Sequence, residues 1–134
     1  MKPPSQRSAD FDAVFARLRA ILVPYARTLH ANHDKPDYYY LETKTVLYKG
    51  RPVFFAAVRK GKGYVSFHLM PVYAYPKLRA TLSPALRKRM QGKACFNFTT
   101  VDEDLFEELR QLTAAGAEGF TEKMLRGASG ATCD

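Results

Sequence analysis

The chain has 134 residues, of which 46% are hydrophobic and 25% are charged, and its 21 Lys and Arg against 13 Asp and Glu give a formal net charge of +8. This composition is typical of one globular domain, which at this length buries enough surface for a core without added cross-links. No apolar run approaches the roughly 20 residues of a membrane-spanning helix, so we expect no membrane partner. The basic residues are dispersed along the chain, which is typical of solubility charge and disfavours a nucleic-acid partner.

Two features of the sequence bear on the compartment. The first residues are charged rather than apolar, so they do not resemble a secretory signal. Two cysteines, Cys95 and Cys133, are too few for a disulfide framework. We expect a cytoplasmic protein with reduced thiols, either monomeric or homodimeric. We also expect a single domain over 1–134, with flexible residues at 1–7 and 127–134.

A long helix is predicted near the start of the chain. Apolar side chains recur at helical spacing from Phe11 to Leu29. Pro24 interrupts the pattern, so we expect either a kink there or a second short helix with Pro24 in its first turn. A turn at 34–36 ends the segment.

Three runs rich in aromatic and β-branched residues follow, at 38–48, 53–59 and 64–70. Short basic turns with glycine separate them, at 49–52 and 60–63. Turns of this length require antiparallel pairing, so the runs predict a strand meander. The second run is apolar on both faces, which favours a place inside the sheet.

The C-terminal half is predicted to add a short helix, a strand and a long helix. An aromatic loop over 71–76 leads to a helix at 83–91, with Pro84 in its first turn. Residues 94–99 form a fourth strand. The segment 100–103 resembles a capping box that opens an amphipathic helix.

These elements predict an α+β domain. Its sheet is largely antiparallel, with about four to six strands, and long amphipathic helices from both ends of the chain pack on one face. Such helices need an apolar sheet face to bury against, and Phe67 and Phe96 lie on strands that supply one.

The opposite face of the sheet is the predicted ligand site. Alternation along the third strand places Tyr64, Ser66 and His68 together on this face, and Asn97 joins them from the fourth strand. Aromatic area with a few orienting polar groups is typical of a ligand-binding surface. Lys44 or Lys93 would balance the charge of an anionic ligand. The alternative is an antiparallel sheet whose outer side is simply solvated.

Two other kinds of site are weighed against this one. The basic turn residues could bind single-stranded nucleic acid through charge, together with exposed tyrosines; they are Lys49, Arg51, Lys60 and Lys62. Acidic residues gather at 102–108 and could offer oxygen ligands to a hard cation, although they also complement the start of a helix. The histidines and cysteines have no zinc-binding spacing.

From Gly63 onward the chain resembles the DUF1801 family, also called YdhG-like. The resemblance is carried by GYVSFHLMPVY (63–73), LSPALRKRMQGKACFNF (82–98) and LFEELRQL (105–112). It implies a compact bacterial α+β domain of uncharacterised activity, and it supplies no catalytic residues. One branch of the family is described as a frataxin-like iron chaperone, which makes iron handling a further alternative.

We therefore expect a binding protein rather than an enzyme, which holds a small anionic or aromatic ligand on the polar sheet face around His68. No catalytic residue, metal ligand or cofactor is assigned. The alternatives are nucleic-acid association through the basic turns and iron handling by the acidic residues.

Overall fold

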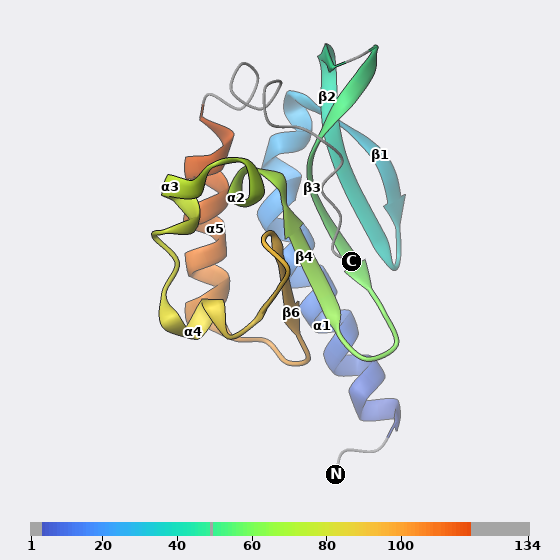
Figure 1. The fold of residues 1–134 in the computed structure, drawn as a ribbon. Coiled ribbons are helices and arrows are strands. Elements are labelled where there is room, and N and C mark those ends of the chain that lie inside the picture. Colours follow the sequence, from blue (N-terminus) through green and yellow to red (C-terminus); the bar gives the residue numbers. More distant parts are fainter. Residues whose placement is uncertain (1–3, 49, 119–134) are drawn as a thin grey trace.

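The fold was analysed in a computed structural model, which describes residues 4–48 and 50–118. It combines helices with a six-stranded antiparallel sheet, so the predicted α+β class is confirmed (Figure 1). The elements in chain order are α1 (Pro4–Leu22), the 3-10 helix η1 (Val23–Arg27), β1 (Leu29–Lys35), β2 (Tyr38–Tyr48), β3 (Arg51–Lys60), β4 (Val65–Leu69), α2 (Met70–Ala74), α3 (Pro76–Arg79), α4 (Pro84–Arg87), β5 (Met90–Gln91), β6 (Cys95–Phe98) and α5 (Glu103–Ala117).

The sheet has the strand order β1-β2-β3-β4-β6-β5, and every neighbouring pair is antiparallel. The strands β2, β3 and β4 form the predicted meander, in which β3 is interior, and β1 adds an edge strand that was not predicted. Gly50 closes the turn before β3 with a φ of +78°, a conformation that glycine adopts without steric cost. In the part of the chain that the structure describes, no helix has the length and apolarity to cross a membrane.

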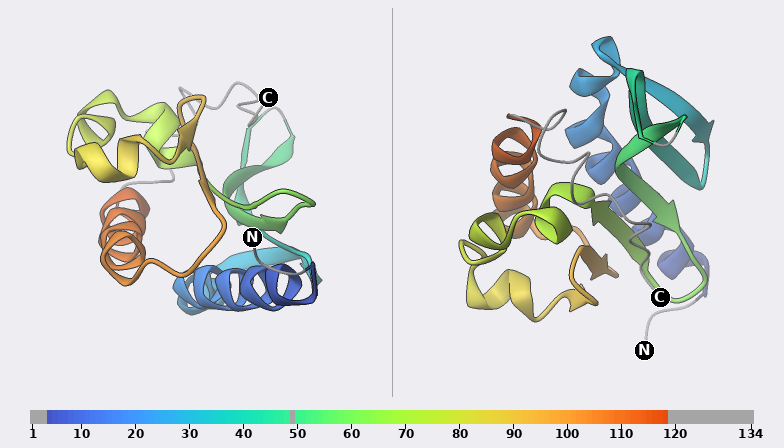
Figure 2. Two further views of the ribbon diagram at one scale, coloured as in Figure 1. Left: turned by 90° about the horizontal axis from the view of Figure 1, so that it is seen from below. Right: turned by 45° about the horizontal axis from the view of Figure 1, so that its top comes forward.

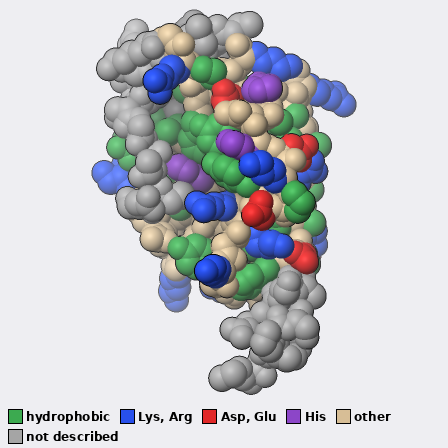
Figure 3. Space-filling view, turned by 90° about the vertical axis from the view of Figure 1, so that its right-hand side faces the viewer, with side chains coloured by type: hydrophobic (Ala, Val, Ile, Leu, Met, Phe, Trp, Pro, Cys, Tyr) green, Lys and Arg blue, Asp and Glu red, His purple; other side chains and the backbone are tan. Residues whose placement is uncertain are grey.

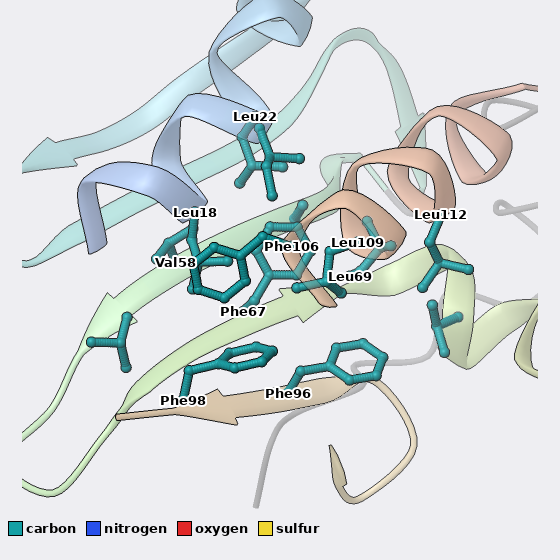
Figure 4. Close-up of a cluster of buried hydrophobic side chains, with 14 of the residues drawn as sticks. Leu18, Leu22, Val58, Phe67, Leu69, Phe96, Phe98, Phe106, Leu109 and Leu112 are labelled. Carbon is teal, nitrogen blue, oxygen red and sulfur yellow. The ribbon is translucent and has the colours of Figure 1, made fainter. Parts of the chain in front are cut away.

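The helices α1 and α5 pack on one face of the sheet (Figures 1 and 2). Leucines of α1 meet Phe106 and Leu109 of α5 over the apolar side of the strands, where Phe67 and Phe96 are fully buried (Figure 4). The helix α1 lies on β3 and β4. On the surface, Arg17 of α1 forms a two-pronged ion pair with Glu103 of α5 at 2.5 Å.

Side-chain caps place the short C-terminal elements. Ser83 accepts a hydrogen bond from the backbone N–H of Leu86, and Pro84 occupies the first turn of α4, as predicted. Asp102 caps α5 by accepting from the backbone N–H of Leu105. The helix therefore starts within the segment that resembled a capping box.

Several predicted boundaries are wrong. The first helix starts at Pro4, earlier than predicted, whereas 1–3 and 127–134 lie outside the described residues. The first helix ends at Leu22, and Pro24 lies in η1, which matches the alternative of a second short helix. The chain from Leu29 then forms the edge strand β1. The expected aromatic loop is helical, as α2 and α3.

Candidate functional site

The strand register separates the sheet into a core face and an outer face, the outer face being the one opposite α1 and α5. Val65, Phe67 and Leu69 of β4 are buried in the core, so Ser66 and His68 point to the outer face. His68 pairs with Ala57 of β3 and with Cys95 of β6. Ser66 and His68 therefore lie on the face opposite the helices, as the alternation of the sequence predicted.

A continuous row of five rings crosses the outer face from β1 to β4. The centroid distances between neighbours are 4.8 Å for His33 and Tyr38, 6.0 Å for Tyr38 and Tyr40, 4.8 Å for Tyr40 and Phe54, and 4.7 Å for Phe54 and His68. We call these five residues the aromatic row. Such spacings are typical of favourable aromatic pairs.

A bulge in β3 explains why Phe54 joins the row. Leu41 pairs with Ala56, but the next residue of β2, Glu42, pairs with Phe54, so Phe55 is the extra residue. Phe55 is buried in the core with 1% of its surface exposed. Without this extra residue, the alternation along β3 would give Phe54 the facing of Ala56 in the core.

The sequence YYY at the start of β2 is divided between the two faces. Tyr38 and Tyr40 lie in the aromatic row, while Tyr39 is buried on the core side. There the guanidinium of Arg19 lies 4.5 Å from the centroid of the Tyr39 ring and also pairs with Asp34 of β1. The edge strand β1 is thus tied to α1.

His68 has an imidazole nitrogen without a partner. Its Nε2 is buried and makes no hydrogen bond. Burial lowers the pKa of His68 from 6.5 to about 4, so the ring is neutral at neutral pH. A buried polar atom left unsatisfied costs about 1–3 kcal/mol.

Glu42 is the second group on this face without a partner. It follows Tyr40 by two residues in a regular stretch of β2, and so has the same facing. Only 8% of its surface is exposed. No hydrogen bond or ion pair to its carboxylate occurs among the described residues. Burial raises the pKa of Tyr40 to about 12, and the charge of Glu42 and the neighbouring Tyr38 add to this effect.

Three of the predicted ligand residues are joined in a hydrogen-bonded chain beside His68. Ser66 Oγ donates to Asn97 Oδ1 at 2.8 Å, and Asn97 Nδ2 donates to Gln91 Oε1 at 2.9 Å. Tyr64 Oη donates to the same Gln91 oxygen at 3.3 Å. The structure therefore brings Tyr64, Ser66 and Asn97 together. Their side chains, however, form these hydrogen bonds with one another and with Gln91.

The two predicted lysines lie elsewhere. Lys44 Nζ donates to the backbone carbonyl of Arg27 at 3.4 Å, at the end of η1. Lys93 is exposed in the turn between β5 and β6. Arg59 of β3 is a cation that does lie on this face. It is the cross-strand partner of Tyr38 in β2 and of Ser66 in β4. Sequence reasoning missed Arg59, Phe54 and Gln91, because the strand register was unknown.

The surface view agrees with this arrangement. On the side of the molecule where β1 and β2 lie, histidine and hydrophobic side chains are exposed together, with Lys, Arg, Asp and Glu among them (Figure 3). Contiguous apolar surface of this kind is often a binding surface in soluble proteins.

The basic turns do not form one patch. Arg51 and Lys60 are the two ends of β3, separated by nine residue steps, or about 30 Å at the usual rise of a strand. Lys60 Nζ is paired with Asp12 of α1 at 2.5 Å. Arg51 and Lys62 are exposed, and Lys49 lies outside the described residues.

Most of the acidic residues at 102–108 have structural partners. Asp102 caps α5 and Glu103 pairs with Arg17, as described above, whereas Glu107 pairs with Arg110 at 2.6 Å. Glu108 accepts from both the backbone N–H and the Oγ of Ser83, at 2.9 and 2.6 Å. Over residues 4–48 and 50–118, no three His, Cys, Asp or Glu side chains are grouped in a way that could hold a metal ion.

Cys95 lies beside His68 in the register and is disulfide-bonded. The expectation of reduced thiols is therefore wrong for this residue, and Cys133 lies outside the described residues. A sulfur in a disulfide is not a thiolate, so Cys95 and His68 do not form a nucleophile and base in this state. Because disulfides persist mainly in oxidising compartments, the cytoplasmic location stays a prediction.

Comparison of the chain with models of protein families, with curated proteins and with solved structures found no match. The resemblance to the DUF1801 family therefore also stays a prediction.

Proposed function

We propose that this chain is a non-enzymatic binding protein that holds a small ligand on the outer face of its sheet, centred on His68 and Phe54. The observation that carries the proposal is the aromatic row, which ends at a histidine whose buried Nε2 has no partner. Rings supply apolar contact area, and a few polar groups fix the orientation of a ligand. The rings of Phe54 and His68 lie 4.7 Å apart, so a planar group lying on Phe54 would also lie beside the imidazole.

The neighbouring residues support a binding role rather than a chemical one. The chain Tyr64–Gln91–Asn97–Ser66 is internally hydrogen-bonded and forms a fixed polar border on one side of His68. A neutral imidazole offers one donor and one acceptor nitrogen, which suits it to recognition. With Cys95 held in a disulfide, no nucleophile lies beside it in the register.

Three probes with one ring and different charges would test the proposal: tryptamine, which is cationic; tryptophol, which is neutral; and indole-3-acetate, which is anionic. The measurement is the change in the ring resonances of ¹³C-labelled His, Phe and Tyr as each probe is added. We expect at least one probe to shift His68 and Phe54 in a saturable way. The substitution Phe54→Leu, which removes the ring but keeps apolar volume, weakens this binding.

Phe11→Leu is the matched control, because Phe11 is also a partly buried phenylalanine but packs on the core from α1. It is expected to leave binding unchanged. Failure of all three probes to bind at millimolar concentration would overturn the proposal. Equal weakening by both substitutions would show that the ligand does not lie on the outer face.

A further inference from the structure

We propose that the ligand of the outer face is an amine, whose ammonium group is held by the Glu42 carboxylate against the rings of Tyr40 and Phe54. This inference rests on the proposed binding function and names the chemical class of its ligand. An aromatic body on the amine would extend along the row toward His68. The sequence suggested an anionic or aromatic ligand; the inference keeps the aromatic body and replaces the negative charge with a positive one.

The burial of Glu42 is the first reason. Glu42 is 92% buried, and its carboxylate has no ion pair or hydrogen bond among the described residues. Its oxygens still reach the surface, because His68 Nε2 is the one fully buried side-chain polar atom in the described part of the chain that lacks a hydrogen bond. The carboxylate is therefore held at the surface by a side chain that is otherwise covered, where a ligand can meet it. A cationic group would therefore gain a charge interaction that the protein does not satisfy on its own.

The rings around Glu42 are the second reason. Phe54 is the direct cross-strand partner of Glu42, and Tyr40 precedes it by two residues on the same face. The centroids of the Tyr40 and Phe54 rings are 4.8 Å apart. Ring faces attract cations, and a carboxylate next to aromatic faces is a suitable environment for an ammonium group.

The nearby cations that the structure describes do not take this place. Lys44, which follows Glu42 by two residues, donates to the Arg27 carbonyl instead. Arg59 is the cross-strand partner of Tyr38, toward the other end of the aromatic row. His30 of β1 is the cross-strand partner of Glu42, but it is exposed and forms no ion pair with the Glu42 carboxylate. Among the described residues, therefore, no cation is paired with Glu42, and the cationic group of a ligand would take this place.

The test compares the dissociation constants of tryptamine, tryptophol and indole-3-acetate for the intact chain, from the same NMR titrations. A cation–π contact together with an ion pair corresponds to roughly a tenfold or larger change in affinity. We expect tryptamine to bind at least tenfold more tightly than tryptophol, and indole-3-acetate to bind most weakly. Glu42→Gln, which is isosteric, should abolish the preference for tryptamine and leave tryptophol unchanged.

Glu118→Gln is the matched control, because it makes the same change in net charge at an exposed position after α5. Equal affinities for tryptamine and tryptophol, or an unchanged preference in Glu42→Gln, would overturn the inference while the binding function stands. Absence of binding by any probe would instead overturn both. If Glu42→Gln does not fold, the ranking of the three probes on the unmodified chain decides the question.

Discussion

The imidazole of His68 lies 4.7 Å from the ring of Phe54, centroid to centroid, at the point where the aromatic row meets the polar residues of β4 and β6. The contact places a titratable group against an apolar ring on the outer face. Its Nε2 is buried without a partner. The protonation of His68 is therefore coupled to folding.

We expect the protein to lose stability in mild acid because of His68. Burial lowers its pKa from 6.5 in the unfolded chain to about 4 in the fold, so the unfolded chain binds the proton first as the pH falls. The contribution of this residue is complete above pH 6.5 and is lost as the pH falls toward 4. The slope is about 1.4 kcal/mol per pH unit in this window. Urea unfolding at several pH values measures it.

The substitution His68→Gln removes the titrating group and should make this part of the profile flatter. His30→Gln serves as the control, since His30 is exposed on β1. A profile of the His68→Gln variant that keeps the original slope between pH 6.5 and 4 would contradict the assignment.

Tyr40 gives a matching prediction at alkaline pH. Its pKa is raised to about 12, mainly by burial, so the unfolded chain releases the phenolic proton first, near pH 10. Stability should therefore fall as the pH rises from 10 to 12. Tyr40→Phe cannot ionise and should lose less stability over this range than the parent chain. Absorbance of phenolate at 295 nm should show one late-titrating tyrosine that the variant lacks; no difference between the two titrations would refute the prediction.

The sequence was sufficient for the fold class because its signals are local. Alternation in β4 and the glycine turns around β3 fix a meander, and the apolar stripes of α1 and α5 require a sheet face to cover. The edge strand β1 was missed because Leu29 continues the helical spacing of the preceding stripe. The sequence predicts a strand up to Met70 and a loop from Pro71, whereas Met70–Ala74 is helical, with Pro71 well placed in the first turn.

The site could be predicted only in part, for a physical reason. The facing of Ser66 and His68 follows from the alternation of a single regular strand. Phe54 owes its facing to the bulge at Phe55, and no local pattern in an all-apolar run shows which residue is the extra one. The partners of Lys44 and Lys60 depend on long-range packing. The pairing of strands therefore had to be known before the aromatic row could be seen.

Gly116 in the last turn of α5 is required by a close approach to α2. A Cβ added at this position would lie 2.6 Å from Cβ and 2.9 Å from Cγ of Pro71, distances that real Cβ atoms do not adopt. Pro71 is buried and its ring is rigid, so it cannot move away as a flexible side chain could.

We expect Gly116→Ala to destabilise the fold by about 1–3 kcal/mol, the usual effect of overpacking a core. This is the opposite of the gain of about 1 kcal/mol that alanine normally brings over glycine inside a helix. Ala115→Gly is the companion variant: Ala115 is exposed in the same helix, so its loss should reflect helix propensity alone. Urea unfolding of both variants separates the two effects. A Gly116→Ala variant that is more stable than the parent would mean that α2 does not pack against α5 at Pro71 in solution.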